Sequence, residues 1–226
     1  MPAALVTGGS SGIGLAIARM LRDEGYDLTI AARNEVRLEG AAKELGAYGI
    51  VANVAQEEDC LRLVHEHLER FGRIDVLVNS AGVGIGGNVD QMTTKKWDLQ
   101  FAVNLRGAFI VTRESIPKLR ESRGLVVNLA SIAGTIPTPG LAAYGASKAA
   151  LISLTKSLNR ELEGEGVRLC ALCPGFVDTP MASWTGMSSE EMIHPDDCAE
   201  VVRMLLKLSP AARIPQVVIE RVGESH

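Results

Sequence analysis

The chain has 226 residues, of which 46% are hydrophobic and 22% are charged, so it is long enough to bury a substantial core. Its formal net charge of -4 gives no general attraction to nucleic acid or to an anionic membrane surface, and we expect neither as a partner. No apolar run approaches the roughly 20 residues of a membrane span, and no secretory signal precedes the first apolar run, so we expect a cytoplasmic protein.

Short β-rich apolar runs alternate with longer helical stretches. Several runs are apolar on nearly every residue, which is typical of strands covered on both faces of a parallel sheet. The expected strands are residues 3–7, 27–32, 48–52, 74–79, 124–130, 167–173 and 216–220. The expected helices are residues 12–24, 34–45, 57–71, 94–120, 144–163 and 195–208. This order predicts an α/β fold, a Rossmann-like doubly wound parallel sheet of about seven strands, in a single domain over residues 1–226.

The first expected strand runs directly into a glycine-rich loop, Thr7-Gly8-Gly9-Ser10-Ser11-Gly12-Ile13-Gly14. Glycines allow a tight turn and let backbone N–H groups approach a pyrophosphate, and the following helix N-terminus adds partial positive charge. The spacing GxxxGxG resembles the TGxxxGIG motif of the short-chain dehydrogenase/reductase family, and the resemblance continues along essentially the whole chain. It implies the strand order 3-2-1-4-5-6-7. It also implies cofactor contacts from Gly8, Ser10, Ser11, Gly12, Ile13 and Gly14.

The end of the second expected strand bears on the choice of cofactor. In a dinucleotide fold this end meets the adenine ribose, where a carboxylate accepts the 2′-hydroxyl and an arginine attracts a 2′-phosphate. Here the strand ends in Ala32 and Arg33 follows, which favours NADPH over NADH. The resemblance adds Asn53 and Val54, after the third strand, beside the adenine.

The fourth expected strand ends in Asn79-Ser80-Ala81-Gly82, which resembles the family's NNAG sequence. Small residues here let the backbone pack close to the adenine side of a cofactor. The resemblance therefore implies cofactor contacts from Asn79, Ala81 and Gly82. We interpret the glycine-rich stretch that continues to Gly87 as a loop of the site.

The expected catalytic set consists of four residues that lie further along the chain. Tyr144 and Lys148 are four residues apart, so they lie on one face of a helix. Ser131 follows an apolar strand thirteen residues before Tyr144, which matches the family's serine on the fifth strand and YxxxK on the next helix. Asn104 resembles the family asparagine that holds a water linking the lysine to solvent.

The chemistry explains these residue types. Hydride addition to a ketone leaves a developing alkoxide, so an acid must deliver a proton. We expect the ammonium of Lys148 to lower the pKa of the Tyr144 phenol and to bond the ribose hydroxyls of the nicotinamide. We expect Ser131 to donate to, or orient, the substrate oxygen.

Cys170 and Cys173 form a CxxC, a spacing that also occurs in metal and redox sites. Residues three apart on a strand point to opposite faces, and no second pair completes a zinc set, so we interpret both as buried core residues and expect no metal. The sequence does not favour a serine hydrolase, because it offers no suitable histidine as the catalytic base. His65 and His67 lie in a charged helical stretch, and His194 precedes a proline.

After the sixth expected strand, residues 174–179 resemble the family's PGxxxT, which faces the nicotinamide. The resemblance implies cofactor contacts from Pro174, Gly175, Val177 and Thr179. The segment at about 179–195 is expected to form a short mobile substrate lid. Its large side chains are expected to give the site an apolar lining, and they are Met181, Trp184 and Met187.

These patterns predict an NADPH-dependent oxidoreductase that passes a hydride between nicotinamide and a ketone or secondary alcohol. A 3-oxoacyl or 3-hydroxy-acid compound is the suggested substrate class. The alternative is a catalytically silent NADP(H)-binding regulatory protein, against which the intact Ser131, Tyr144 and Lys148 argue. The helix that carries Tyr144 is rich in small residues, and the resemblance implies that it pairs across a two-fold axis in a homodimer or homotetramer.

Overall fold

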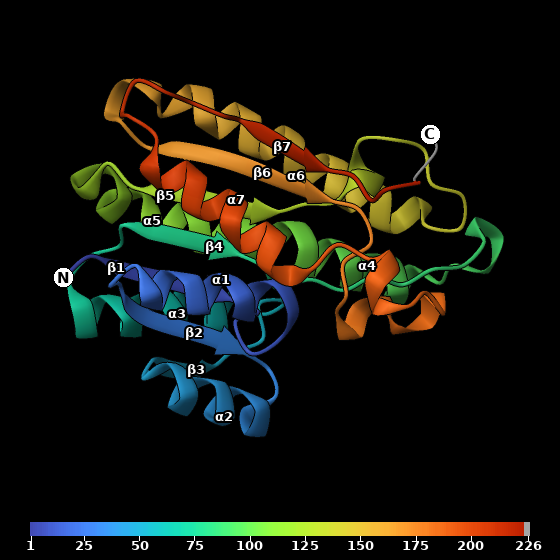
Figure 1. Ribbon diagram of the computed structural model, residues 1–226, viewed down its shortest axis with the longest axis horizontal. Helices are drawn as coiled ribbons and strands as arrows, with labels where there is room; N and C mark the ends of the chain where they lie inside the picture. The colour runs from blue at the N-terminus through green and yellow to red at the C-terminus, as the bar shows by residue number, and fades with distance from the viewer. Residues whose placement is uncertain (224–226) are drawn as a thin grey trace.

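The computed structural model describes residues 1–223 and contains a seven-stranded parallel sheet in the order β3-β2-β1-β4-β5-β6-β7 (Figure 1). The predicted fold class and strand order are therefore confirmed. Residues 224–226, where the expected domain ends, lie outside the described residues. The strands are β1 (Ala3–Thr7), β2 (Asp27–Ala32), β3 (Tyr48–Val51), β4 (Val76–Asn79), β5 (Leu125–Leu129), β6 (Arg168–Pro174) and β7 (Gln216–Ile219).

Helices cover both faces of the sheet (Figure 1). The helices α1 (Gly12–Asp23), α2 (Glu35–Leu45) and α7 (Pro195–Lys207) pack on one face. The helices α3 (Glu57–Phe71), α5 (Ala108–Ser122) and α6 (Ala142–Glu161) pack on the other. Local signals set several ends: the Asn34 side chain caps α2, and Gly72, with φ of 70°, ends α3 in the left-handed region.

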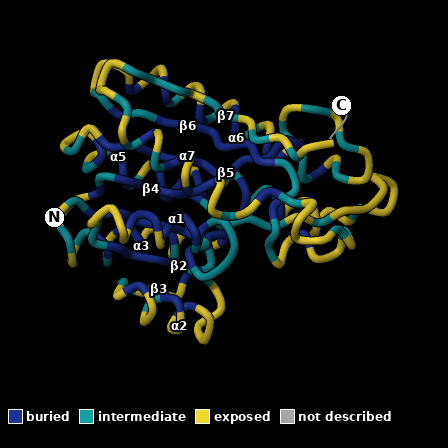
Figure 2. The backbone as a smooth tube through the Cα atoms, in the orientation of Figure 1, coloured by how far each residue is buried: buried dark blue, intermediate teal, exposed yellow. Residues whose placement is uncertain are grey.

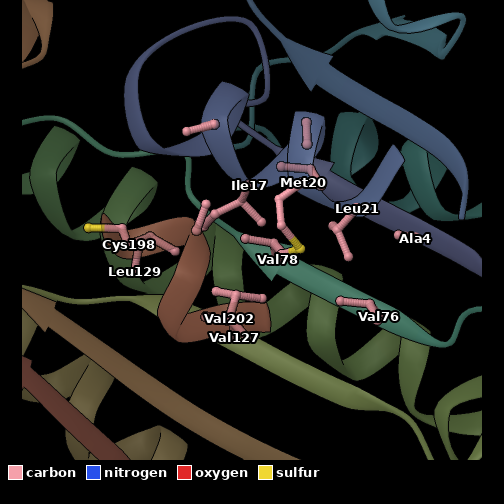
Figure 3. Packing of buried hydrophobic residues seen from close by; sticks show 14 of the residues in the cluster. Ala4, Ile17, Met20, Leu21, Val76, Val78, Val127, Leu129, Cys198 and Val202 are labelled. Carbon is pink, nitrogen blue, oxygen red and sulfur yellow. The ribbon is translucent and has the colours of Figure 1, made fainter. Parts of the chain in front are cut away.

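Alternation along each strand sends neighbouring side chains into opposite layers of the core. Figure 3 shows Ile17 of α1 and Val202 of α7 over Val78 and Val127 of the sheet. On β6, Cys170 belongs to this layer and Cys173 to the opposite one, and both are fully buried. The interpretation of the CxxC as core residues is confirmed.

The expected helix over residues 94–120 was wrong in one respect, because the structure divides it. After α4 (Thr94–Phe101) comes a π-helical segment, η2 (Ala102–Gly107), and α5 follows directly. A Cβ atom on Gly107 would lie 2.4 Å from the carbonyl oxygen of Val54, so the segment packs too closely against that loop for any other residue. Other element ends differ from expectation by one or two residues.

His67, which belongs to the charged helical stretch noted in the sequence, is fully buried. Its Nδ1 lies 2.7 Å from Thr29 Oγ1 and its Nε2 lies 3.0 Å from the carbonyl oxygen of Arg73. Burial lowers the pKa of the imidazole to about 4, so the ring is neutral at ordinary pH. It acts as a core residue that joins α3 to β2.

The carboxyl ends of the strands face one edge of the molecule, at the right of Figure 1. Figure 2 shows the central strands as buried and much of the chain beyond this edge as exposed. Within the described residues, no helix is long and apolar enough to cross a bilayer. Ala142, Ala146 and Ala149 of α6 are exposed, and pairing of this helix with a second copy stays a prediction.

Candidate functional site

The glycine-rich loop between β1 and α1 forms a close-fitting cradle. The N–H groups of Gly8 and Gly9 donate to the carbonyl oxygen of Ala31, at 2.8 and 3.2 Å, which ties the loop to β2. A Cβ atom on Gly14 would lie 2.3 Å from the carbonyl oxygen of Gly8, so only glycine fits. The Ser11 side chain makes no capping bond to α1, which leaves the first-turn N–H groups available to an anion. This geometry fits a dinucleotide pyrophosphate.

The ends of β2 and β3 lie side by side, since Ala32 pairs with Val51. Arg33, just beyond β2, is exposed and takes part in no ion pair among the described residues. The amide oxygen of Asn53 accepts the N–H of Ala55 at 3.2 Å, so its position is fixed by its own loop. Contact of these residues with an adenine ribose stays a prediction.

The residues that follow β4 pack against the glycine-rich loop between β1 and α1. A Cβ atom on Gly8 would lie 2.7 Å from the backbone nitrogen of Ala81, which shows how tightly the two segments pack. The Asn79 side chain instead turns inward and donates to Thr112 Oγ1 at 3.0 Å and to Asn128 Oδ1 at 2.8 Å. Asn79 therefore holds the strands beneath the site rather than lining it.

A cavity of about 660 Å³ opens at the carboxyl ends of β4, β5 and β6. The expected catalytic residues Ser131, Tyr144 and Lys148 all line it. Expected cofactor residues that line the same cavity are Ile13, Gly82, Pro174, Gly175, Val177 and Thr179. The cavity therefore joins the expected catalytic residues to the expected nicotinamide end of the cofactor site.

Tyr144 and Lys148 lie one turn apart on α6, with Lys148 Nζ 5.7 Å from the centroid of the Tyr144 ring. The ammonium is buried and donates to the carbonyl oxygen of Leu129 at 2.6 Å. Burial lowers the pKa of Lys148 to about 8. The Lys148 amine is therefore held at the site and can release its proton at a pH close to neutral.

The pKa of Tyr144 differs from the expectation. Desolvation raises the pKa of the phenol above its usual range, and the hydrogen bond with the Ser131 side chain opposes that rise in part. The expected net lowering of this pKa by Lys148 is not found in this structure, because desolvation of the phenol has the larger effect and the ammonium donates to Leu129. The phenol is consequently held in its protonated form, as an acid.

Asn104 lies in the π-helical segment η2 and binds the glycine-rich loop 82–87. Its Oδ1 accepts the N–H of Val83 at 2.8 Å, and its Nδ2 donates to the carbonyl oxygen of Val83 at 2.9 Å. The same Nδ2 donates to Ser147 Oγ at 3.0 Å, between Tyr144 and Lys148 on α6. Asn104 therefore fixes the loop against the helix that carries the catalytic pair.

Gln100 is a second anchor of this loop, and the sequence reasoning missed it. It is fully buried one helical turn before Asn104, and its Oε1 accepts the N–H of Ile85 at 2.9 Å. Between the two anchored residues, a Cβ atom on Gly84 would lie only 3.6 Å from Tyr144 Cε2. The four-residue spacing from Gln100 to Asn104 was an available signal, because it places both amides on one helix face.

The expected lid begins and ends close together, since Val177 forms a bridge with Ile193. Met181 and Trp184 line the cavity, whereas Met187 is not among the described residues that line it. The lining role expected for Met187 was therefore wrong: it follows Gly186, which has φ of 71° and turns the chain after the short helix Pro180–Thr185. Movement of the lid stays a prediction.

Comparison with known proteins agrees with this architecture. The family model described as short chain dehydrogenase matches residues 2–188. The chain is 35% identical over 222 residues to an uncharacterized oxidoreductase of Staphylococcus epidermidis, covering 97% of this chain and 96% of that protein.

Two solved structures show the same fold. One is an alcohol dehydrogenase from the archaeon Thermococcus sibiricus complexed with 5-hydroxy-NADP, with a TM-score of 0.92, 32% identity, and coverage of 100% of this chain and 98% of that chain. The other is a 3-ketoacyl-(acyl-carrier-protein) reductase from Brucella melitensis complexed with NADH, with a TM-score of 0.90, 30% identity, and coverage of 98% and 97%. The chain therefore belongs to the short-chain dehydrogenase family of oxidoreductases.

Proposed function

We propose that this protein reduces a ketone to a secondary alcohol with NADPH, and catalyses the reverse oxidation with NADP. The observation that carries the proposal is the presence of Ser131, Tyr144 and Lys148 on one cavity that also reaches Pro174 and Gly175 of the PGxxxT segment. A bound nicotinamide cofactor supplies the hydride in reduction and accepts it in oxidation. The chain supplies the proton and the orientation of the substrate.

The Tyr144 phenol is the proton donor in this proposal. Desolvation keeps its pKa high, so it carries the proton that the developing alkoxide requires. Ser131 lies within hydrogen-bonding reach of the phenol and donates to the same substrate oxygen. Lys148, with a pKa of about 8, holds a proton close to the phenol and can restore it.

Arg33 supports NADPH as the preferred cofactor. It is exposed at the end of β2 and pairs with no carboxylate of residues 1–223, and a guanidinium there attracts a 2′-phosphate. The similar structures carry an NADP derivative in one case and NADH in the other, so the preference depends on this chain's own residue. The similarity to a 3-ketoacyl reductase also supports a 3-oxoacyl substrate among the candidates.

The test is steady-state oxidation of NADPH with a panel of ketones, by the wild-type protein and Tyr144→Phe. We expect Tyr144→Phe to lower kcat by about 100-fold or more, because the proton donor is lost, while NADPH affinity is retained. Normal NADPH binding without turnover of any ketone by the wild-type protein would instead favour the silent regulatory protein.

A further inference from the structure

The substrate side of the cavity is built from three segments that meet beyond Tyr144. Ile85 comes from the loop 82–87, Ile136 and Leu141 come from the segment between β5 and α6, and Met181 and Trp184 come from the lid. The first two segments are tied together, since the N–H of Gly87 donates to the carbonyl oxygen of Gly140 at 2.8 Å. Large aliphatic and aromatic side chains therefore surround the place where a substrate substituent must lie.

Lys148 is the one charged side chain among the described residues that line this cavity. It is 4% exposed and already donates to Leu129, and in the proposed function it serves the phenol and the cofactor. The remaining polar groups on the lining side chains are neutral: the hydroxyls of Ser80, Ser131, Thr138, Tyr144 and Thr179 and the indole N–H of Trp184. Ser131 and Tyr144 are assigned to the reacting oxygen. Among the described residues, the lining includes no arginine, histidine or side-chain amide that could pair with a substrate carboxylate.

The mouth of the cavity carries exposed apolar surface. Met181 is 46% exposed and Trp184 is 68% exposed, with the Trp184 ring edge-on to Phe176 at a centroid distance of 6.1 Å. When an apolar substituent covers these exposed side chains, their apolar surface is removed from water, which favours binding. Apart from the neutral indole N–H of Trp184, these two side chains offer an anion no compensation for its lost hydration.

We propose that the site accepts an uncharged ketone or secondary alcohol with an apolar substituent and rejects the corresponding free carboxylate. A carboxylate moved into such a cavity loses most of its hydration, and the neutral hydroxyl and indole donors of the lining compensate that loss only in part, because Lys148 already donates to Leu129. The proposal rests on the proposed function and narrows it: an uncharged 3-oxoacyl compound remains a suitable substrate, and a free 3-hydroxy acid does not.

The first test compares kcat/KM for matched esters and acids: methyl para-acetylbenzoate against para-acetylbenzoate, and ethyl levulinate against levulinate. Each pair presents the same reacting ketone and differs in one charge and in the small alkyl group of the ester. We expect the ester to exceed the acid by at least about 100-fold in each pair. Acids within about fivefold of their esters would overturn the proposal and leave the proposed reaction standing.

A second measurement needs no turnover. The chain has two tryptophans, so Trp97→Phe leaves Trp184 as the single fluorophore, and Trp184→Phe is the matched control. We expect ethyl levulinate to change the Trp184 emission saturably, and levulinate to have no saturable effect at the same concentrations. An equal response to both ligands would contradict the proposal. This titration remains decisive even if no ketone is reduced, an outcome that would refute only the proposed function.

A positive charge introduced at the mouth of the cavity should make the site accept carboxylates better. Met181→Lys adds a cation beside the lining residues, and Met181→Leu is the matched control of similar volume. We expect Met181→Lys to narrow the ester preference by about tenfold or more, and Met181→Leu to keep it. A preference unchanged in Met181→Lys would count against the cavity as the place where the substituent binds.

Discussion

Replacing Lys148 by methionine separates the stability of the site from its chemistry. The buried ammonium has its pKa lowered from 10.5 to about 8, which corresponds to about 3 kcal/mol of free energy. Because the folded pKa lies below the unfolded value, the cost of the buried charge is fully present below pH 8 and is relieved as pH rises toward 10.5. Methionine keeps a similar length and carries no charge.

The assay is urea unfolding of the cofactor-free wild-type, Lys148→Met and Lys156→Met proteins at several pH values from 7 to 10. Between these limits the wild-type free energy of unfolding should rise relative to that of Lys148→Met by roughly 2 to 3 kcal/mol. Loss of the bond to Leu129 shifts the Lys148→Met curve by a constant and does not change this slope. Lys156→Met removes an exposed charge from the same helix and should run parallel to the wild type. Parallel wild-type and Lys148→Met curves would refute the reasoning.

Three further variants test other parts of the account. Gln100→Leu leaves the N–H of Ile85 without its partner, so KM for the ketone should rise about tenfold while KM for NADPH is unchanged; an equal rise in both would contradict a local role. His67→Gln should remove an acid-sensitive component. The contribution of His67 to the wild-type free energy of unfolding falls by about 2 kcal/mol between pH 7.5 and 5, because the imidazole is protonated in the unfolded chain while the buried ring stays neutral, and urea titrations should show a smaller fall in the variant. Arg33→Asp should reverse the cofactor preference, because kcat/KM for NADPH falls while kcat/KM for NADH is largely kept. An unchanged ratio of the two kcat/KM values would show that Arg33 does not contact the 2′-phosphate.

The sheet and the cofactor loop were predictable because their signals are local. Uninterrupted apolar runs indicate strands buried on both faces, and the sequence around Gly8 and Gly14 can form only one kind of turn when a strand precedes it and a helix follows. The spacing of Tyr144 and Lys148 is equally local. Their meeting with Ser131 follows from the parallel sheet, whose strand ends share one edge.

The features that were missed depend on contacts between distant segments. The π-helical segment forms where Gly107 packs against Val54, and nothing in residues 102–107 alone indicates it. The direction of the Tyr144 pKa depends on desolvation by the whole cavity rather than on its spacing from Lys148. The burial of His67 was accessible, because it continues a buried stripe through Cys60, Leu63 and Val64 at helical spacing.

Transfer of a label from the cofactor to the substrate tests the central claim most directly. The wild-type protein would be incubated with NADPH deuterated at the transferable nicotinamide position and with methyl para-acetylbenzoate, and the alcohol product analysed by mass spectrometry. We predict one deuterium on the carbinol carbon, and a rate of labelled product reduced by about 100-fold or more in Tyr144→Phe. A labelled alcohol formed equally fast by Tyr144→Phe, or the absence of any labelled alcohol from protein that binds NADPH, would contradict the account.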